Sequence, residues 1–493
     1  MTTHTAQPPD EPRGRSPAVG VQPGKAFPWW LPAGRVQWRH DSQFFHYLGT
    51  FGYPFHLWLG VLWCALVVGP MATVELGAIA VGVCFLARLP FVWRGLWDAL
   101  RQPAVIFLGL WCVWGWVLTA RSGWSADALH EMSFQRWAYA FVVLWAVMDN
   151  RRLLVVGLAV GFVLAQLAQL GEFFGYRFGI DRLVWSHPPA PDPAARISGW
   201  WHQPAIGGAM LVACLGLHLG PALFGRGRVR VIAIVASGAT VVALLATGTR
   251  GAWVAAAGLV GAVLVLGVVA AMTDSFARGD ARLRDGADGA TVLGRGGVLR
   301  QFAVLVGVVA VVVGAIFLVP QTRSRVSLLV TEVRDVLTRD DLDSDMGGRV
   351  LAAKAAVDAI AKHPVAGVGP GGFHAHVQRY ATEKAITIAP HRLEKLKTAH
   401  NTFLHTAATQ GLVGAVLLYA GLVCAIWGGL RPRTVHGVPV LRQHLGSYAA
   451  APAIALLGMV IVGAFESTPV NTSTGALSTV LIALCGWVRA REG

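Results

Sequence analysis

Residues 244–264 read LLATGTRGAWVAAAGLVGAVL, and Arg250 is the only charged residue among them. Long apolar runs flank this stretch, and runs of about 20 residues, enough to cross a bilayer, recur from Phe55 to the C-terminus. Of all residues, 55% are apolar and 14% are charged. We therefore predict an all-α integral membrane protein, in which Arg250 lies in a tight turn between two spans.

The apolar runs predict about twelve transmembrane helices, with very short turns inside the pairs at 55–93 and 231–272. Their approximate bounds are 55–71, 73–93, 103–120, 134–148, 153–174, 205–224, 231–247, 251–272, 302–320, 403–430, 448–465 and 472–488. If the N-terminal tail is cytoplasmic, every short cytoplasmic loop carries at least two arginines, and each opposite short loop carries one Lys or Arg at most. This distribution follows the positive-inside rule. Both termini are therefore expected in the cytoplasm, and Arg250 at the outer boundary of the membrane.

The same arginines explain the formal net charge of +15, so we expect contacts with membrane lipids and none with nucleic acid. The expected organisation is a disordered cytoplasmic tail over 1–52, spans one to nine over 53–320, a periplasmic helical segment over 321–402, spans ten to twelve over 403–488, and a cytoplasmic C-terminus over 489–493. All six cysteines lie inside apolar runs, which indicates neither a disulfide framework nor a metal site.

The segment 321–402 is the one sizeable aqueous region that the sequence predicts. Apolar residues at helical spacing from Val326 to Leu337 predict an amphipathic helix. A second helix is expected in RVLAAKAAVDAIAKHP, with Val350, Ala353, Val357 and Ile360 as its apolar face. Both are too short to span, so we expect them to lie across the periplasmic mouth of the bundle.

Asp341, Asp343 and Asp345 have the alternating spacing of a calcium loop. The pattern then fails, because Met346 stands at the glycine position and Ala352 where the closing glutamate belongs. We therefore expect a solvated turn that caps a helix, and no metal.

The stretch HPVAGVGPGGFHAHVQRY carries four glycines, at 367, 369, 371 and 372, around Pro370 and predicts a tight turn. As a nucleotide loop it is weak, because neither a preceding strand nor a following Lys-Ser/Thr is present. His400 and Asn401 then stand directly before the next apolar run. The predicted topology places His400 level with Arg250 on the periplasmic side.

A guanidinium and an imidazole in a water-poor pocket suit group transfer from a lipid diphosphate. Arginine binds phosphate oxygens in a bidentate manner and neutralises a leaving diphosphate. A histidine that titrates near neutral pH can take the proton of an acceptor hydroxyl.

Three stretches, LLATGTRGAWVA, GGRVLAAKAAVDAIAKHPVAGVGPGGF and AHNTFLHTAATQGLVG, together resemble the O-antigen ligase family of lipopolysaccharide assembly over 244–414. The resemblance implies a GT-C-like, inverting glycosyltransferase without metal or other cofactor. It also implies an undecaprenyl-diphosphate-linked polysaccharide donor and a lipid A–core sugar hydroxyl as acceptor, with the active site on the periplasmic face of a bacterial inner membrane.

By the same resemblance, Arg250 and Arg349 would bind the donor diphosphate, and His400 would activate the acceptor hydroxyl or hold the reacting groups in register. Other polar residues suit lesser roles. Candidate pocket residues are Arg196, His202, Gln203 and Asn401, although Gln203-Pro204 replaces the Pro-Asn pair that relatives often show. His405 is expected to pack or hydrogen-bond inside the bundle. Arg392, Lys395 and Lys397 suit either the acceptor's phosphates or a solvated face.

Three alternatives stay open. An O-antigen polymerase would use the same donor, but two comparably long periplasmic loops are expected for it, and one dominates here. A protein O-oligosaccharyltransferase often carries a further domain after the last spans, whereas this sequence ends at Gly493. A transporter or flippase would show charges near mid-bilayer and an internal repeat.

Overall fold

The computed structural model describes residues 43–178, 197–201, 203–285, 314, 320–339, 342–431, 434–435, 438–439, 441–467 and 472–486. Its longer helices are α1 (Gln43–Leu66), α2 (Met71–Leu100), α3 (Pro103–Arg121), α6 (Arg151–Phe178), α7 (Pro204–Phe224), α8 (Gly227–Ala246), α9 (Arg250–Asp285), α11 (Pro320–Arg339), α12 (Asp345–Lys362), α13 (Phe373–Glu383), α15 (Thr402–Leu430), α17 (Ala451–Val462) and α18 (Thr472–Cys485). The short elements are α4 (Ala126–Ser133), η1 (Phe134–Tyr139), α5 (Ala140–Trp145), η2 (Met148–Asn150), η3 (Gly199–Trp201), α14 (Pro390–Leu393), α16 (Leu441–Leu445) and the antiparallel pair β1 (Thr434–Val435) and β2 (Val438–Pro439).

Within the described ranges, seven helices are long and apolar enough to cross a membrane. They are α2, α3, α6, α7, α8, α9 and α15. These seven coincide with seven of the twelve predicted spans, and the chain is a multi-pass membrane protein. The prediction of about twelve transmembrane helices is confirmed only in this part, and the segment 302–320 lies outside the described residues apart from Gly314 and Pro320.

Four of the predicted spans have a different form in the structure. The first, at 55–71, lies in α1, which begins at Gln43 and ends at Leu66. The segment 134–148 is not one helix, because η1, α5 and η2 divide it. The last two are α17, with 12 residues, and α18, with 14. At 1.5 Å per residue such helices are shorter than the apolar core of a bilayer, but interruptions are tolerated where the backbone is buried in protein.

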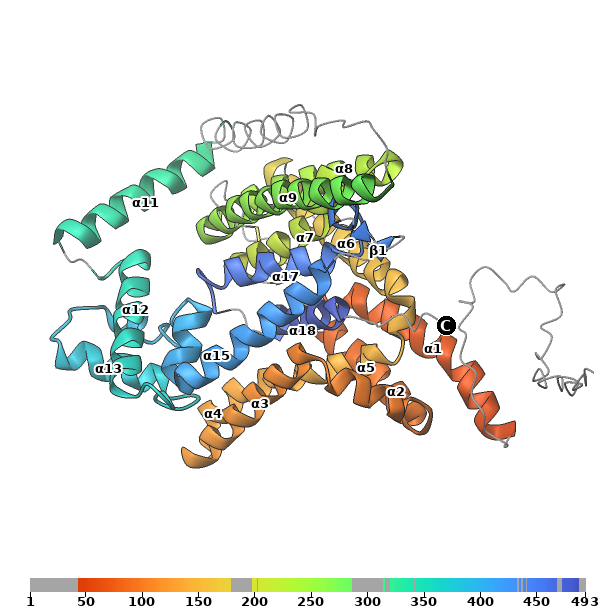
Figure 1. Ribbon diagram of the computed structural model, residues 1–493. Helices are drawn as coiled ribbons and strands as arrows, with labels where there is room; N and C mark the ends of the chain where they lie inside the picture. Colours follow the sequence, from red (N-terminus) through yellow and green to blue (C-terminus); the bar gives the residue numbers. More distant parts are fainter. Residues whose placement is uncertain are drawn as a thin grey trace, which may run out of the picture. The chain divides into compact units, whose positions relative to one another are not determined.

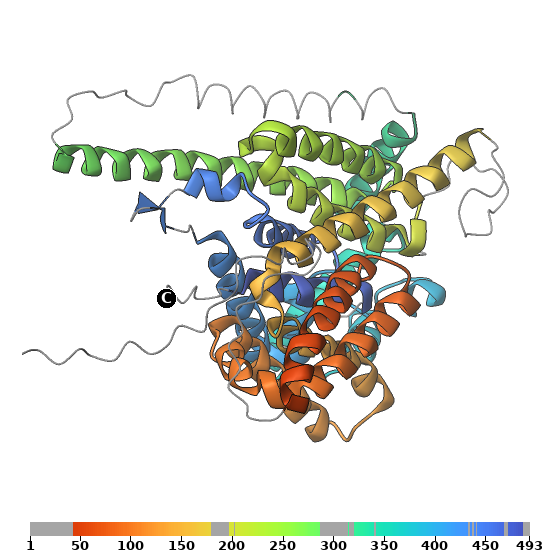
Figure 2. The ribbon, with the colours of Figure 1, turned by 90° about the vertical axis from the view of Figure 1, so that its right-hand side faces the viewer.

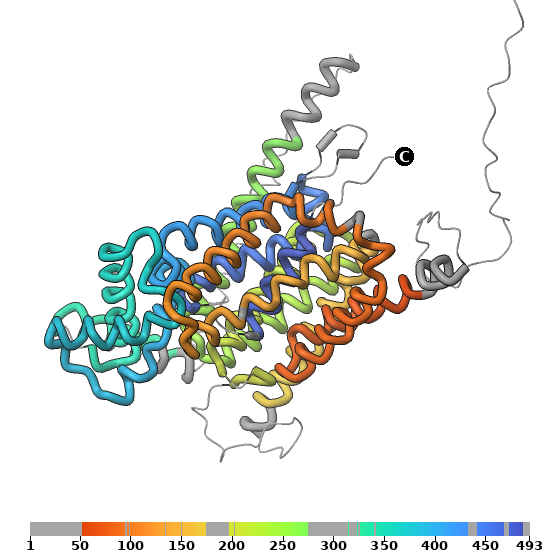
Figure 3. The backbone as a smooth tube through the Cα atoms, turned by 90° about the horizontal axis from the view of Figure 1, so that it is seen from below, coloured from red at the N-terminus to blue at the C-terminus, as the bar shows by residue number. Residues whose placement is uncertain are grey.

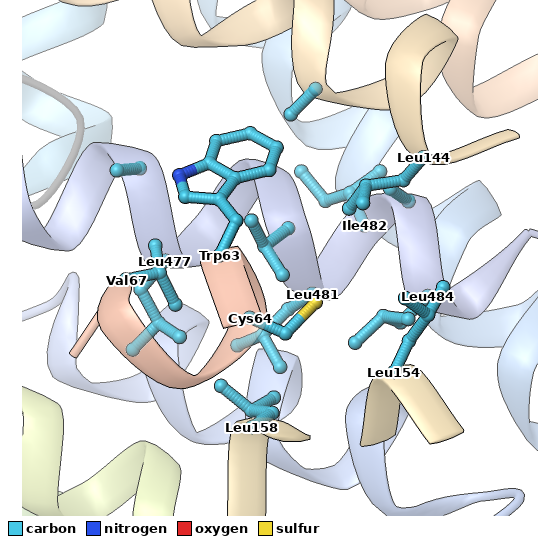
Figure 4. Close-up of a cluster of buried hydrophobic side chains, with 14 of the residues drawn as sticks. Trp63, Cys64, Val67, Leu144, Leu154, Leu158, Leu477, Leu481, Ile482 and Leu484 are labelled. Atoms are coloured by element: carbon cyan, nitrogen blue, oxygen red, sulfur yellow. The ribbon is translucent and has the colours of Figure 1, made fainter. Parts of the chain in front are cut away.

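The apolar core lies between helices that are distant in sequence. Figure 4 shows side chains of α1, α5, α6 and α18 in contact, with Trp63 and Cys64 fully buried among leucines of the other helices. Two central helices, α7 and α17, cross so closely that a Cβ on Gly216 would lie 2.6 Å from the Cα of Ala455. Small residues permit such close packing, which drives helix association in membranes.

The helices α8 and α9 form an antiparallel pair that packs on α7 (Figures 1 and 2). The predicted turn joins them over Thr247, Gly248 and Thr249, so that Arg250 is the first residue of α9. Gly248 has a φ of 61°. Glycine adopts this left-handed conformation without steric cost, which explains its place in the turn.

The helices α12 and α13 gather beside the beginning of α15 (Figure 3). The second predicted helix is confirmed as α12, but its predicted apolar face is wrong at Val357, which is 56% exposed, while Val350 and Ile360 are partly buried against the core. The buried face is made by Leu351 and alanines, including Ala355 and Ala359. Alanine is small enough for α12 to lie close against its neighbours.

The predicted glycine-rich turn is inserted into a break in α15. Gly411 has φ 71° and ψ 177°, which interrupts the helix. The freed backbone groups bond to the turn instead: the Val368 N–H donates to the Ala408 carbonyl at 2.8 Å, and the Leu412 N–H donates to Pro364 at 2.8 Å. A Cβ on Gly411 would overlap the Val365 carbonyl oxygen. The glycines of this turn therefore serve close backbone packing.

Candidate functional site

Arg250 begins α9 directly after the turn that α7 supports. The Thr249 hydroxyl donates to the Pro204 carbonyl at 2.9 Å, which ties the turn to the beginning of α7. The amide groups at the beginning of a helix lack internal partners and carry partial positive charge. An arginine at this position adds a full positive charge, so this end of α9 favours an anion.

The anion present there is the carboxylate of Glu332, on α11. Arg250 Nη1 lies 3.1 Å from Glu332 Oε2, and the two side chains are 22% and 12% exposed. This shielding from solvent strengthens the ion pair relative to one on an open surface. The pair joins α11 to the turn between α8 and α9.

Arg349, on the first turns of α12, reaches the segment that follows α17. Its Nη1 donates to the Phe465 carbonyl at 2.7 Å, and its Nη2 donates to Glu466 Oε1 at 2.8 Å. The Arg349 side chain is 39% exposed, so it remains accessible to a ligand.

His400 faces the other oxygen of the same carboxylate. Its Nδ1 lies 3.5 Å from Glu466 Oε2, which is a long and weak hydrogen bond. An ionised carboxylate can only accept, so the favoured neutral tautomer carries its proton on Nδ1 and leaves Nε2 free to accept one. His400 also has a φ of 49°, a strained value for a residue with a side chain.

Glu466 is ionised in this setting. Burial disfavours its charged form, but the hydrogen bond from His400 and the positive charge of Arg349 outweigh burial and lower the pKa of Glu466 below its usual range. The carboxylate therefore carries its charge between two cationic or basic groups.

The segment 463–466 holds the site together through its backbone. The Thr402 N–H donates to the Gly463 carbonyl at 2.6 Å, and the Thr402 hydroxyl donates to the Glu466 carbonyl at 2.9 Å. On the other side, a Cβ on Gly251 would lie 2.8 Å from the Cβ of Phe465. The residue after Arg250, the guanidinium of Arg349 and the residues around His400 thus all meet this one segment.

The remaining candidate pocket residues divide into two groups. Asn401 caps α15, because its side-chain oxygen accepts from the Leu404 N–H at 2.9 Å, and its amide donates to the Ala464 carbonyl at 3.1 Å. Gln203 is exposed at the beginning of α7, next to the proline that holds Thr249. Arg196 and His202 lie outside the described residues.

His405 is buried inside the bundle, as predicted. Its Nε2 lies 3.6 Å from Glu131 Oε1, and its ring packs edge-on against Phe373. Glu131 also accepts from the Gly371 N–H at 2.6 Å. Burial raises the pKa of Glu131, but the hydrogen bond and charge of His405 outweigh it and the pKa is lowered. This second pair fastens α4 to the glycine-rich turn and to α15.

Two aspartates of the calcium-like spacing, Asp343 and Asp345, contact Arg392 of the basic cluster, and Asp341 lies outside the described residues. Arg392 pairs with Asp343 at 3.4 Å and with Asp345 at 3.1 Å. Between them Ser344 caps α12, since its hydroxyl accepts from the Gly347 N–H at 2.9 Å. The predicted helix cap is confirmed. Over the described residues, no group of three His, Cys, Asp or Glu side chains is placed to hold a metal ion.

An apolar cavity of about 60 Å³ lies between α3, α15, α17 and α18. Thr402 and Gly463, whose backbones bond to each other at the site, line it together with apolar side chains. Gln135 also lines it, and neither polar atom of its buried amide has a partner among the described residues. The cavity therefore continues from the segment 463–466 into the bundle.

Sequence reasoning missed both carboxylates of the site. Glu466 stands at the end of a predicted span, and a lone charge at the boundary of an apolar run was the same signal that identified Arg250. Glu332 lies among alternating charges on an amphipathic helix, where nothing in the sequence separates it from its solvated neighbours.

Comparison with known proteins adds an independent finding. Residues 231–419 match the model of a protein family that is described as O-antigen ligase. The matched range includes Arg250, Arg349 and His400 and stops before Glu466. A search among curated proteins found no match.

Proposed function

We propose that this chain, whose residues 231–419 match the O-antigen ligase family model, transfers a polysaccharide from undecaprenyl diphosphate to a sugar hydroxyl of lipid A–core. Members of this family are ligases and related polymerases that act as glycosyltransferases. The single observation that carries the proposal is the meeting of Arg349 and His400 on Glu466, beside the turn of Arg250.

The two arginines are proposed to hold the donor diphosphate. Arg250 offers a guanidinium at the beginning of a helix, and Arg349 offers one that is partly exposed. Both now bind carboxylates, which are the anions that the chain itself can supply. A diphosphate carries more charge and matches the fork of a guanidinium, so it competes for both. As the glycosidic bond breaks, the arginines stabilise the charge on the leaving diphosphate.

His400 is proposed as the general base. With Nδ1 directed to Glu466, Nε2 can accept the proton of the acceptor hydroxyl while its oxygen attacks the anomeric carbon. A single displacement of this kind inverts the configuration at that carbon. In this proposal the side chains of the protein carry every step, without metal or cofactor. The reaction would take place on the periplasmic side of the inner membrane, and both termini would be cytoplasmic.

The proposal is tested by reconstitution. The purified protein is supplied with lipid-linked polysaccharide and lipid A–core in the presence of a chelator. We expect ligated product from the wild type, none from Arg250→Ala, and wild-type yield from Arg334→Ala, which removes an exposed arginine of α11. Lengthening of the lipid-linked chain would instead indicate a polymerase, and glycosylation of an added protein would indicate an oligosaccharyltransferase.

A further inference from the structure

The carboxylate of Glu466 lies closer to Arg349 than to His400. Oε1 lies 2.8 Å from Arg349 Nη2, within the range of a charge-assisted hydrogen bond, whereas Oε2 lies 3.5 Å from His400 Nδ1. Both contacts use the same charge, so one cannot strengthen without consequence for the other. In the absence of a donor, Arg349 holds the stronger contact.

We propose that Glu466 is a positioning residue whose carboxylate moves from Arg349 to His400 when the donor's diphosphate binds. This inference rests on the proposed function, since it needs Arg349 to take up the diphosphate. A bound diphosphate replaces Oε1 as the anionic partner of Arg349. The carboxylate is then free to close on the imidazole, so that occupation of the donor site prepares the base.

The chemical step explains why this order is useful. The acceptor proton moves to Nε2 of His400 while the acceptor oxygen bonds to the anomeric carbon. The bond from that carbon to the diphosphate oxygen breaks, and its electron pair leaves with the diphosphate. His400 becomes a cation during this step, and the nearby Glu466 carboxylate stabilises it. Before the donor binds, the carboxylate is engaged elsewhere, so the base is not yet prepared.

The side-chain carboxylate of Glu466 can be changed without removing the backbone hydrogen bonds that hold its segment in place. The backbone carbonyl of Glu466 already holds the Thr402 hydroxyl at 2.9 Å, and the neighbouring Phe465 carbonyl holds Arg349 at 2.7 Å. These bonds remain when the side chain is changed. The side chain is 21% exposed and extends from a segment that the backbone fixes.

Glu466→Gln separates this role from a loss of folding. Glutamine keeps the size and one accepting oxygen but removes the charge. Arg349 then loses its anionic partner while it keeps its bond to the Phe465 carbonyl, and His400 is left without its anion. We expect the dissociation constant for undecaprenyl diphosphate to fall about threefold or more, while kcat for ligation falls by about tenfold to a hundredfold. Glu466→Asp keeps the charge and is expected to recover part of kcat. A fold defect would instead weaken binding and turnover together.

Further variants distinguish the proposed role of Glu466 from the proposed donor site at Arg349. If Glu466 acts through His400, the double variant with His400→Ala has the turnover of His400→Ala alone. Unchanged binding and turnover in Glu466→Gln, or a parallel loss of both, would overturn the transfer of the carboxylate while leaving the donor site intact. Wild-type affinity for undecaprenyl diphosphate in Arg349→Ala would contradict the donor site itself.

Discussion

Replacing Glu332 by glutamine is predicted to strengthen the binding of a diphosphate at Arg250. The donor must break the ion pair of Arg250 with Glu332, whose atoms are 3.1 Å apart and whose side chains are 22% and 12% exposed. Exposed pairs contribute up to about 1 kcal/mol, and this shielded pair lies at the upper end of that range or above it. Removing about 1 kcal/mol of competition lowers the dissociation constant about fivefold.

The assay is a titration of the purified protein with undecaprenyl diphosphate at fixed ionic strength, because salt screens such contacts. Asp335→Asn is the matched control: it makes the same charge change on the same helix, but its partner is Arg339, which is 77% exposed. The control should bind like the wild type. Equal affinity in Glu332→Gln and wild type, or an equal gain in both variants, would refute competition at Arg250.

Three further results are expected. Gly411→Ala should lower the free energy of unfolding by about 3 kcal/mol or more in thermal unfolding, because its backbone angles and its overlap with a carbonyl exclude a Cβ. Gly238→Ala is the control: a Cβ there meets no atom of another element within 4 Å, and alanine should stabilise the interior of α8 by up to about 1 kcal/mol. A comparable loss of stability in both variants would contradict this packing. The pKa of Glu131 is lowered in the fold, so the stabilisation from its ionised carboxylate is fully present above the unfolded pKa of about 4.3 and is lost as the pH falls through the lower folded pKa. The difference in Tm between wild type and Glu131→Gln should therefore shrink below about pH 4. A difference that stays constant with pH would contradict this role of Glu131. Arg392→Ala should cost less than about 1 kcal/mol in chemical unfolding, since its aspartate partners are 45% and 80% exposed.

Hydropathy predicted the membrane fold well where a helix meets lipid along its length. The pair around Arg250 is an example, because lipid requires a continuous apolar helix of fixed minimum length. The segment 134–148 shows where this reasoning ends: it is apolar and yet divided into three short elements. A buried segment satisfies its backbone against protein, so its hydropathy does not determine whether it is one helix.

The sequence predicted the basic residues of the site but not the carboxylates that pair with them. Arg250 and His400 stand out because each is a polar residue beside a long apolar run. Their partners depend on contacts between residues 82 and 66 positions apart in sequence. Spacing along the chain does not encode such pairings. The face of α12 was mispredicted for a related reason, since alanines were buried by close packing and Val357 was left exposed.

The central claim is that transfer takes place where His400 meets the segment 463–466. The most direct measurement is the initial rate of polysaccharide transfer to lipid A–core by purified wild type, His400→Ala and His391→Ala, all shown to be folded. His391 is an exposed histidine of α14, nine residues before His400, and serves as the control. We predict a loss of about a hundredfold or more for His400→Ala alone. A rate for His400→Ala equal to that of the control would contradict the account.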